Sequence, residues 1–161
     1  MTTEPDDTDN SARAIAAAEA LGLEHTVTRH GPVRSLEEAA IARGVAPRAI
    51  VKTLVVRVSD GDYRFVLVPG DREISWPKLR GLVGVNRLSM PSAEVAFEVT
   101  GYVRGTITPL GSTTAWPVIV DSSISGAVSL GGGAHGVALV VDAEALVRAL
   151  GADVADVTEP E

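Results

Sequence analysis

The sequence predicts one α/β domain in which helices flank a mixed, partly antiparallel β-sheet. A chain of 161 residues can bury one core but leaves little room for a second. Segments rich in Val, Ile and Leu alternate irregularly with helical segments, so that hairpins mix with helical crossovers. Hydrophobic residues make up 45% of the chain and charged residues 22%, which is typical of globular domains.

The N-terminal part of this domain predicts two helices separated by a short strand. SARAIAAAEALG is typical of a helix that Ser11 caps and Gly22 ends. EHTVTRH alternates enough to form a short strand. SLEEAAIARG carries Ser35 and Glu38 at capping-box spacing, and Pro47 fits the first turn of a further short helix.

A β-hairpin follows, formed by AIVKTLVVRV and YRFVLVP around the turn SDGD. Side chains of a strand alternate between its two faces. One face of the first strand is otherwise apolar, yet it carries the charge of Lys52 among Ile50, Leu54, Val56 and Val58. This ammonium group is unexpected, because desolvating a charge costs several kcal/mol unless it is paired.

The second half of the chain predicts three helices and three strands. The helices are SWPKLRGLVG, capped by Ser75, then PSAEVAFEVTG between Ser92 and Gly101, and finally DAEALVRALG, capped by Asp142. The strands are WPVIVD, AVSL and VALVV, and the glycine loop GGGAHG separates the last two. We expect the folded domain to span residues 10–152.

The two ends of the chain are predicted to be acidic tails, disordered over residues 1–9 and fraying over residues 153–161. Each tail has four acidic residues and no basic one, so the body is near neutral although the chain carries −7. The chain has no cysteine, no apolar run of eighteen residues and no signal-peptide pattern. These absences favour a cytoplasmic protein without a membrane partner, and we expect a monomer.

Lys52 allows three interpretations. Its stem could carry the charge to the rim of the sheet, or its ammonium could pair with a carboxylate such as that of Asp121. Alternatively, the strand borders a cleft in which the ammonium meets an anionic ligand. Taken alone, the strand favours the first two interpretations.

Two glycine-rich loops are the other unusual feature. Gly101, Gly105 and Gly111 surround Pro109 in TGYVRGTITPLG, and SLGGGAHG carries three consecutive glycines after a strand. Glycine lets backbone approach a ligand closely and lets N–H groups converge on an oxyanion. Neither loop matches a P-loop or a dinucleotide fingerprint. Two tight turns without a ligand are the alternative, which each loop taken alone favours.

Ser129, with His135 as its base, makes a poor nucleophile. A nucleophile elbow needs glycines two residues to either side of the serine and a helix after it, whereas here Ala127 precedes and a strand follows. The three histidines, His25, His30 and His135, show no metal-ligand spacing. We expect neither a metal nor a cofactor.

Read in order, these segments resemble the YbaK/ProX family of aminoacyl-tRNA deacylases, which is related to the editing domain inserted in bacterial prolyl-tRNA synthetases. The resemblance covers about residues 35–152 and rests on SLEEAAIARGVAPRAIVKTLVVRV, FVLVPGDREISWPKLRGLVGVNRL, VTGYVRGTITPLG, PVIVD and VSLGGGAHG. It implies a YbaK/ProX-like fold and hydrolysis of the ester that joins a wrong amino acid to a tRNA. The partner is then the 3′ acceptor end of aminoacyl-tRNA, with a synthetase as a further candidate.

The resemblance also implies the site. In the family, the lysine that corresponds to Lys52 is required and engages the tRNA 3′ end, while the loop over residues 101–111 lines the pocket. The chain departs from the family at Arg104 and in a longer loop that carries His135, which leaves the preferred amino acid open. The implied catalytic residues are Lys52, Gly105 and Ser129, and the implied substrate-binding residues are Gly101, Thr106, Thr108, Pro109, Gly111, Asp121, Gly131 and His135.

Three functions fit these expectations. The first is a trans-acting deacylase, with alanyl- and cysteinyl-tRNA for proline as its first candidate substrates. The second is a non-catalytic module that uses the same pocket to bind an aminoacyl or nucleotide ligand. The third is an esterase for small esters, which would depend on Ser129 and not on Lys52.

Overall fold

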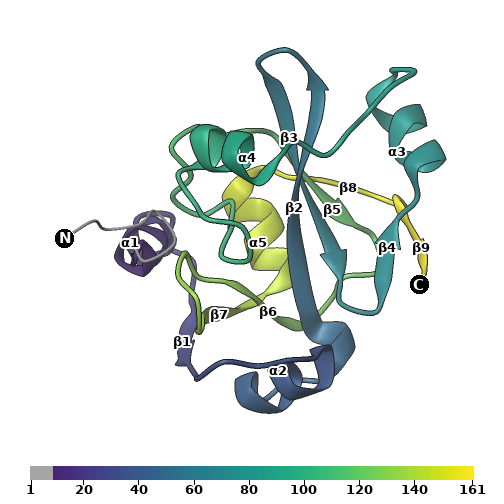
Figure 1. Cartoon of the computed structure of the whole chain (residues 1–161). Helices are drawn as coiled ribbons and strands as arrows, with labels where there is room; N and C mark the ends of the chain where they lie inside the picture. The colour runs from purple at the N-terminus through teal and green to yellow at the C-terminus, as the bar shows by residue number, and fades with distance from the viewer. Residues whose placement is uncertain (1–8) are drawn as a thin grey trace.

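The computed structural model describes residues 9–161 and contains the mixed sheet that the sequence predicts. Seven strands form one sheet in the order β1-β7-β6-β2-β3-β5-β8 (Figure 1). Its neighbours pair antiparallel except β2 with β6, β3 with β5, and β5 with β8, which are parallel. The strands are β1 (Thr26–Arg29), β2 (Ile50–Ser59), β3 (Asp62–Pro69), β5 (Val118–Asp121), β6 (Ala127–Gly131), β7 (Val137–Asp142) and β8 (Asp153–Ala155).

The C-terminal residues 153–161 are part of the fold, so the prediction of a fraying tail is wrong. They form β8, at the edge of the large sheet, and β9 (Thr158–Pro160), which pairs antiparallel with β4 (Arg72–Ile74). Val157 and Thr158 are completely buried. Burial of these two side chains stabilises the folded position of this segment, although the segment is acidic. The tail predicted over residues 1–9 lies outside the described residues, except for Asp9.

Local capping signals predicted the helices well. Ser35, Ser75, Ser92 and Asp142 each accept a hydrogen bond from the N–H three residues later. Ser11 is the exception, because it is the first helical residue and donates to Asp9. The helices are α1 (Ser11–Ala20), α2 (Leu36–Arg43), the short 3-10 helix η2 (Pro47–Ala49), α3 (Trp76–Val83), α4 (Ala93–Thr100) and α5 (Ala143–Leu150). Within residues 9–161, none of them has the length and apolar character needed to cross a membrane.

The sheet separates two main cores, and β2 contributes to both; Ile50 of β2 also packs with Ala39 and Ala40 in a third, small cluster. Val51 and Val55 pack into the larger core, which includes residues of α1 and α5. Leu54 and Val56 belong to the smaller core, which includes Leu79 of α3. Figure 1 shows α3, β4 and β9 together on this side of the molecule. The face of β2 that carries Lys52 is therefore apolar, as alternation predicts.

Candidate functional site

The candidate site lies beside β2, which within residues 9–161 is paired along the whole of one edge but only part of the other. β3 takes the complete edge. On the opposite edge, β6 pairs with Ile50 and Val51, and Arg57 forms a bridge with Ser89. A cavity of about 650 Å³ borders residues 50–55 between these contacts. Its volume is that of a small-ligand pocket.

Backbone groups of β2 open onto this cavity. The Arg57 N–H donates to the Ser89 carbonyl at 2.7 Å, and the Ser89 N–H donates to the Arg57 carbonyl at 3.2 Å. Alternate residues of a strand direct their N–H and C=O groups to the same edge. The N–H and C=O groups of Thr53 and Val55 therefore face the cavity, where they can bind polar groups of a ligand.

The wall of the cavity is cationic. Arg43, Lys52 and Arg104 all line it, and no Asp or Glu among residues 9–161 does. Apolar side chains such as Ile107 and Ala96 supply much of the remaining wall. In a chain whose net charge is −7, this local excess of positive charge indicates a site for an anionic group.

Lys52 carries its ammonium to the rim of the cavity. Its Nζ donates to the Arg72 carbonyl oxygen at 2.8 Å and lies 3.2 Å from Glu161 Oε2. The side chain is 34% exposed and also borders a second cavity, of about 450 Å³, beside Trp76. The interpretation that the ammonium pairs with a carboxylate is confirmed, but the partner is Glu161 and not Asp121, whose carboxylate binds the Val157 N–H instead. The Lys52 ammonium can exchange Glu161 for an incoming anion.

Besides Lys52, two of the predicted site residues, Gly105 and Gly131, line the cavity. Ser129 is fully buried behind the wall, and its Oγ lies 3.5 Å from Arg43 Nη1. His135 is exposed, and a Cβ built on Gly105 would lie 3.4 Å from its Cε1. Gly131 allows the neighbouring loop to approach, since a Cβ there would lie 3.1 Å from a loop carbonyl oxygen. The two glycines thus shape the wall, with His135 beside it.

The loop between α4 and β5 is fastened by Arg13 of α1. Its Nε donates to the Gly111 carbonyl at 2.8 Å, and its Nη2 donates to the Gly101 carbonyl at 3.0 Å. The hydroxyls of Thr106 and Thr108 form hydrogen bonds within the loop itself. These predicted substrate-binding residues hold the loop in shape, and their contact with substrate stays a prediction. The buried residues of the loop include Thr106, Thr108 and Pro109.

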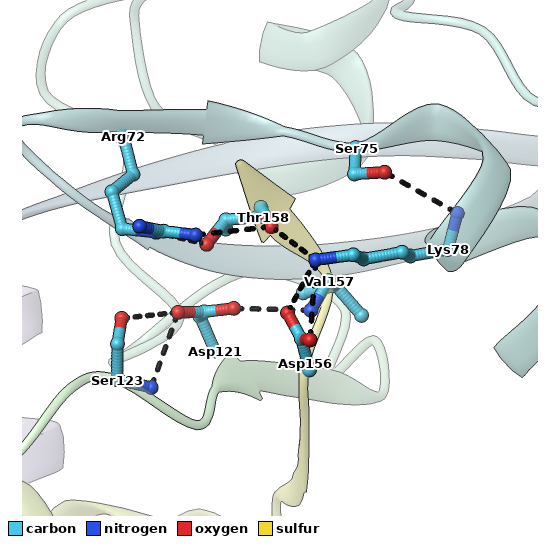
Figure 2. Close-up of polar contacts among 8 residues, drawn as sticks. All are labelled: Arg72, Ser75, Lys78, Asp121, Ser123, Asp156, Val157 and Thr158. Carbon is cyan, nitrogen blue, oxygen red and sulfur yellow. Dashed lines mark hydrogen bonds and ion pairs between the residues drawn. The ribbon is translucent and has the colours of Figure 1, made fainter. Parts of the chain in front are cut away.

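Asp121 lies outside the cavity wall and binds the C-terminal segment. It is 1% exposed; one carboxylate oxygen accepts the Val157 N–H at 3.0 Å, and the other accepts the N–H and hydroxyl of Ser123 (Figure 2). Burial alone would raise the pKa of this carboxyl group, but the hydrogen bonds outweigh burial and hold the pKa below its ordinary value. Asp121 is therefore a charged anchor for β9.

Arg72 and Lys78 tie the same segment to β4 and α3. Arg72 Nε donates to Thr158 Oγ1 at 2.6 Å, and Lys78 Nζ donates to the Thr158 carbonyl at 2.8 Å (Figure 2). Lys78 also pairs with Asp156 at 3.0 Å. Because the Arg72 carbonyl accepts from Lys52, this network fixes the rim of the cavity where the ammonium lies.

The aminoacyl-tRNA editing domain family matches residues 30–149, which are most of the chain and include the residues of β2 and both glycine loops. The chain belongs to this family.

Relatives of the editing domain share this architecture. The solved structure of a proposed trans-editing enzyme for prolyl-tRNA synthetase has a TM-score of 0.85 and 29% identity, over 94% of this chain and 98% of that one. The hypothetical protein APE2540 has a TM-score of 0.81 and 32% identity, over 91% and 99%. Proline–tRNA ligase of Thermosipho melanesiensis is 38% identical over 96 residues, which are 59% of this chain and 17% of the ligase. The chain thus spans a small part of the ligase, and the predicted YbaK/ProX-like editing fold is confirmed.

Arg43, in the wall of this editing domain's cavity, and Glu161, the ion-pair partner of Lys52 outside that wall, escaped the sequence reasoning. Arg43 stands in the last turn of α2, where a basic residue is ordinary because it complements the helix dipole. Glu161 lies 109 residues from Lys52 along the chain, so no local pattern links the two. Local sequence therefore does not distinguish Arg43 from any other basic residue at the end of a helix.

Proposed function

We propose that the chain is a trans-acting aminoacyl-tRNA deacylase. The observation that carries the proposal is the Lys52 ammonium at the rim of a cationic cavity, beside exposed backbone groups of β2. Membership of the editing family and similarity to a proposed trans-editing enzyme support it. The substrate is a tRNA with the wrong amino acid on its 3′ end, and alanyl- and cysteinyl-tRNA for proline are the first candidates.

The residues present suit attack by a positioned water rather than by a serine. Ser129 is fully buried and contacts Arg43, whose guanidinium cannot serve as a base. Water adds to the ester carbonyl carbon, the bond from that carbon to the ribose oxygen breaks, and the ribose oxygen leaves with a proton. The N–H groups of Thr53 and Val55 can stabilise the oxyanion, and positioning suffices because the aminoacyl ester is activated.

A panel of mischarged tRNAs tests the function. We expect the protein to release the amino acid from at least one of them, with alanyl- and cysteinyl-tRNA for proline tested first. Release is measured from radiolabelled aminoacyl-tRNA against the uncatalysed rate. Intact substrates across a broad panel at high protein concentration would refute a deacylase.

The alternative is a non-catalytic module that binds an aminoacyl or nucleotide ligand. It is favoured by the ion pair with Glu161, which leaves Lys52 already occupied. A non-hydrolysable aminoacyl-adenosine analogue that raises the melting temperature, together with no turnover of any mischarged tRNA, would establish this alternative.

Glu161→Gln is expected to raise kcat/KM of the deacylase by up to about fivefold. The Glu161 side chain is 54% exposed, and an exposed ion pair contributes about 0.2–1 kcal/mol. Removing its charge makes the Lys52 ammonium easier for a substrate anion to reach. Glu159→Gln is the matched control, because Glu159 forms no ion pair among the described residues. Equal rates for wild type and Glu161→Gln would show that Glu161 does not compete with substrate.

A further inference from the structure

Arg43 has an unsatisfied guanidinium in the wall of the cavity. Four cationic side chains form ion pairs in residues 9–161, and Arg43 is not among them. Its Nε is buried without a hydrogen-bond partner in that range, and its Nη1 makes one long contact, with Ser129. A buried donor without an acceptor costs about 1–3 kcal/mol, and more when it is charged. Such a group is expected to have a ligand.

The environment of Arg43 indicates a negatively charged ligand group. No carboxylate of the described chain lines this cavity, and burial lowers the pKa of Arg43. Thr53 also lines the cavity, and its hydroxyl is a second buried polar group without a partner in residues 9–161. A guanidinium offers donors in a fixed fork that matches the two oxygens of a carboxylate.

The position of Arg43 separates its ligand from that of Lys52. Arg43 contacts Ser129 of β6, on the side of the cavity where β6 meets β2. The Lys52 ammonium turns outward to Arg72 and Glu161. If tRNA phosphates approach the rim, the part of the substrate that reaches Arg43 is the amino acid side chain.

We propose that Arg43 makes this cavity selective for an aminoacyl group whose side chain carries a carboxylate, such as glutamyl or aspartyl. This inference rests on the proposed deacylase function. The side-chain carboxylate accepts hydrogen bonds from the Arg43 guanidinium. An uncharged side chain leaves the guanidinium unpaired, so its aminoacyl-tRNA is hydrolysed with a lower kcat/KM than the acidic one.

The test uses one tRNA charged in turn with glutamate, glutamine or alanine. We expect kcat/KM for glutamyl-tRNA to exceed that for glutaminyl-tRNA by about tenfold or more, as a charge-assisted hydrogen bond predicts. Arg43→Met, which keeps the length of the stem, should bring this ratio near one, and Arg43→Lys should retain part of it. Arg48→Met is the control, because Arg48 is exposed outside the cavity wall, and it should keep the wild-type ratio.

The other outcomes separate this inference from the proposed function. Hydrolysis of alanyl-tRNA with equal glutamyl and glutaminyl rates overturns the inference and leaves the deacylase standing. Equal slowing of all three substrates by Arg43→Met overturns it too, because Arg43 would then bind a tRNA phosphate. If no tRNA is hydrolysed, the proposed deacylase function is refuted. A binding measurement then tests whether Arg43 recognises a carboxylate. The amide analogue 3′-(L-glutamylamino)-3′-deoxyadenosine must then raise the melting temperature more than its glutaminyl counterpart, and equal shifts refute carboxylate recognition.

Discussion

Lys52→Met is expected to lower kcat/KM for the best aminoacyl-tRNA by about a hundredfold or more. In the proposed deacylase, the ammonium replaces Glu161 with an anionic group of the tRNA 3′ end. Truncating one partner of a desolvated, hydrogen-bonded charge pair costs about 2–5 kcal/mol, and 1.4 kcal/mol is a factor of ten. Initial rates of release from the tRNA, measured below saturation, give the ratio directly.

The loss should occur without unfolding. The ion pair of Lys52 with Glu161 is partly exposed and contributes at most about 1 kcal/mol to stability. Arg57→Met on the same strand is the matched control, because Arg57 forms a surface pair with Asp60 and lies beyond the cavity. If Lys52→Met were folded and hydrolysed substrate as fast as Arg57→Met, Lys52 would have no role in catalysis. Its side chain would then only carry the charge from the apolar face to the rim of the sheet.

The helices and the long hairpin follow from local signals, which is why the sequence predicts them. Ser35, Ser75, Ser92 and Asp142 cap helices through contacts three residues away. The β2–β3 hairpin depends on a turn and on alternation over ten and eight residues. Interactions of this kind are visible in any short window of the chain.

The two C-terminal strands, and β4 with which one of them pairs, depend on distant partners instead. β4, β8 and β9 have three residues each, which is too short to show alternation. They are held by contacts such as that of Asp121 with Val157, 36 residues apart. An acidic segment with little apolar content has the sequence of a disordered tail. In the structure, however, its Val157 is buried in the smaller core.

The sequence predicts the position of Lys52 in the site, but it predicts much less about the residues that surround Lys52. Alternation alone isolates one charge on an apolar face. The cavity arises because β6 pairs with only the first residues of β2 within the described chain, and such a register is set by tertiary contacts. That pairing places Ser129 opposite Ile50 and buries it. The residue-level roles of Gly105, Ser129 and the loop threonines therefore stay predictions.

Asp121→Ala is expected to lower the free energy of unfolding by about 2–4 kcal/mol, because it leaves the buried Val157 N–H without its acceptor. The effect should extend to activity. Val157 leads into β9, and β9 holds β4, whose Arg72 carbonyl accepts from Lys52. Urea unfolding at neutral pH measures the stability. Asp153→Ala, at an exposed position of β8, is the control and should change it little.

The acid limb of the stability curve tests the same anchor independently. The folded state lowers the pKa of Asp121 below the ordinary value of 3.8, so its carboxylate stabilises the fold above that value. This contribution is lost as the pH falls through the lower, folded-state pKa. Wild type should therefore lose more stability than Asp121→Asn on acidification from about pH 5 to pH 3. Parallel acid limbs for the two proteins would mean that the hydrogen bonds of Asp121 do not depend on its charge, and that β9 is held mainly by Arg72, Lys78 and the burial of Val157.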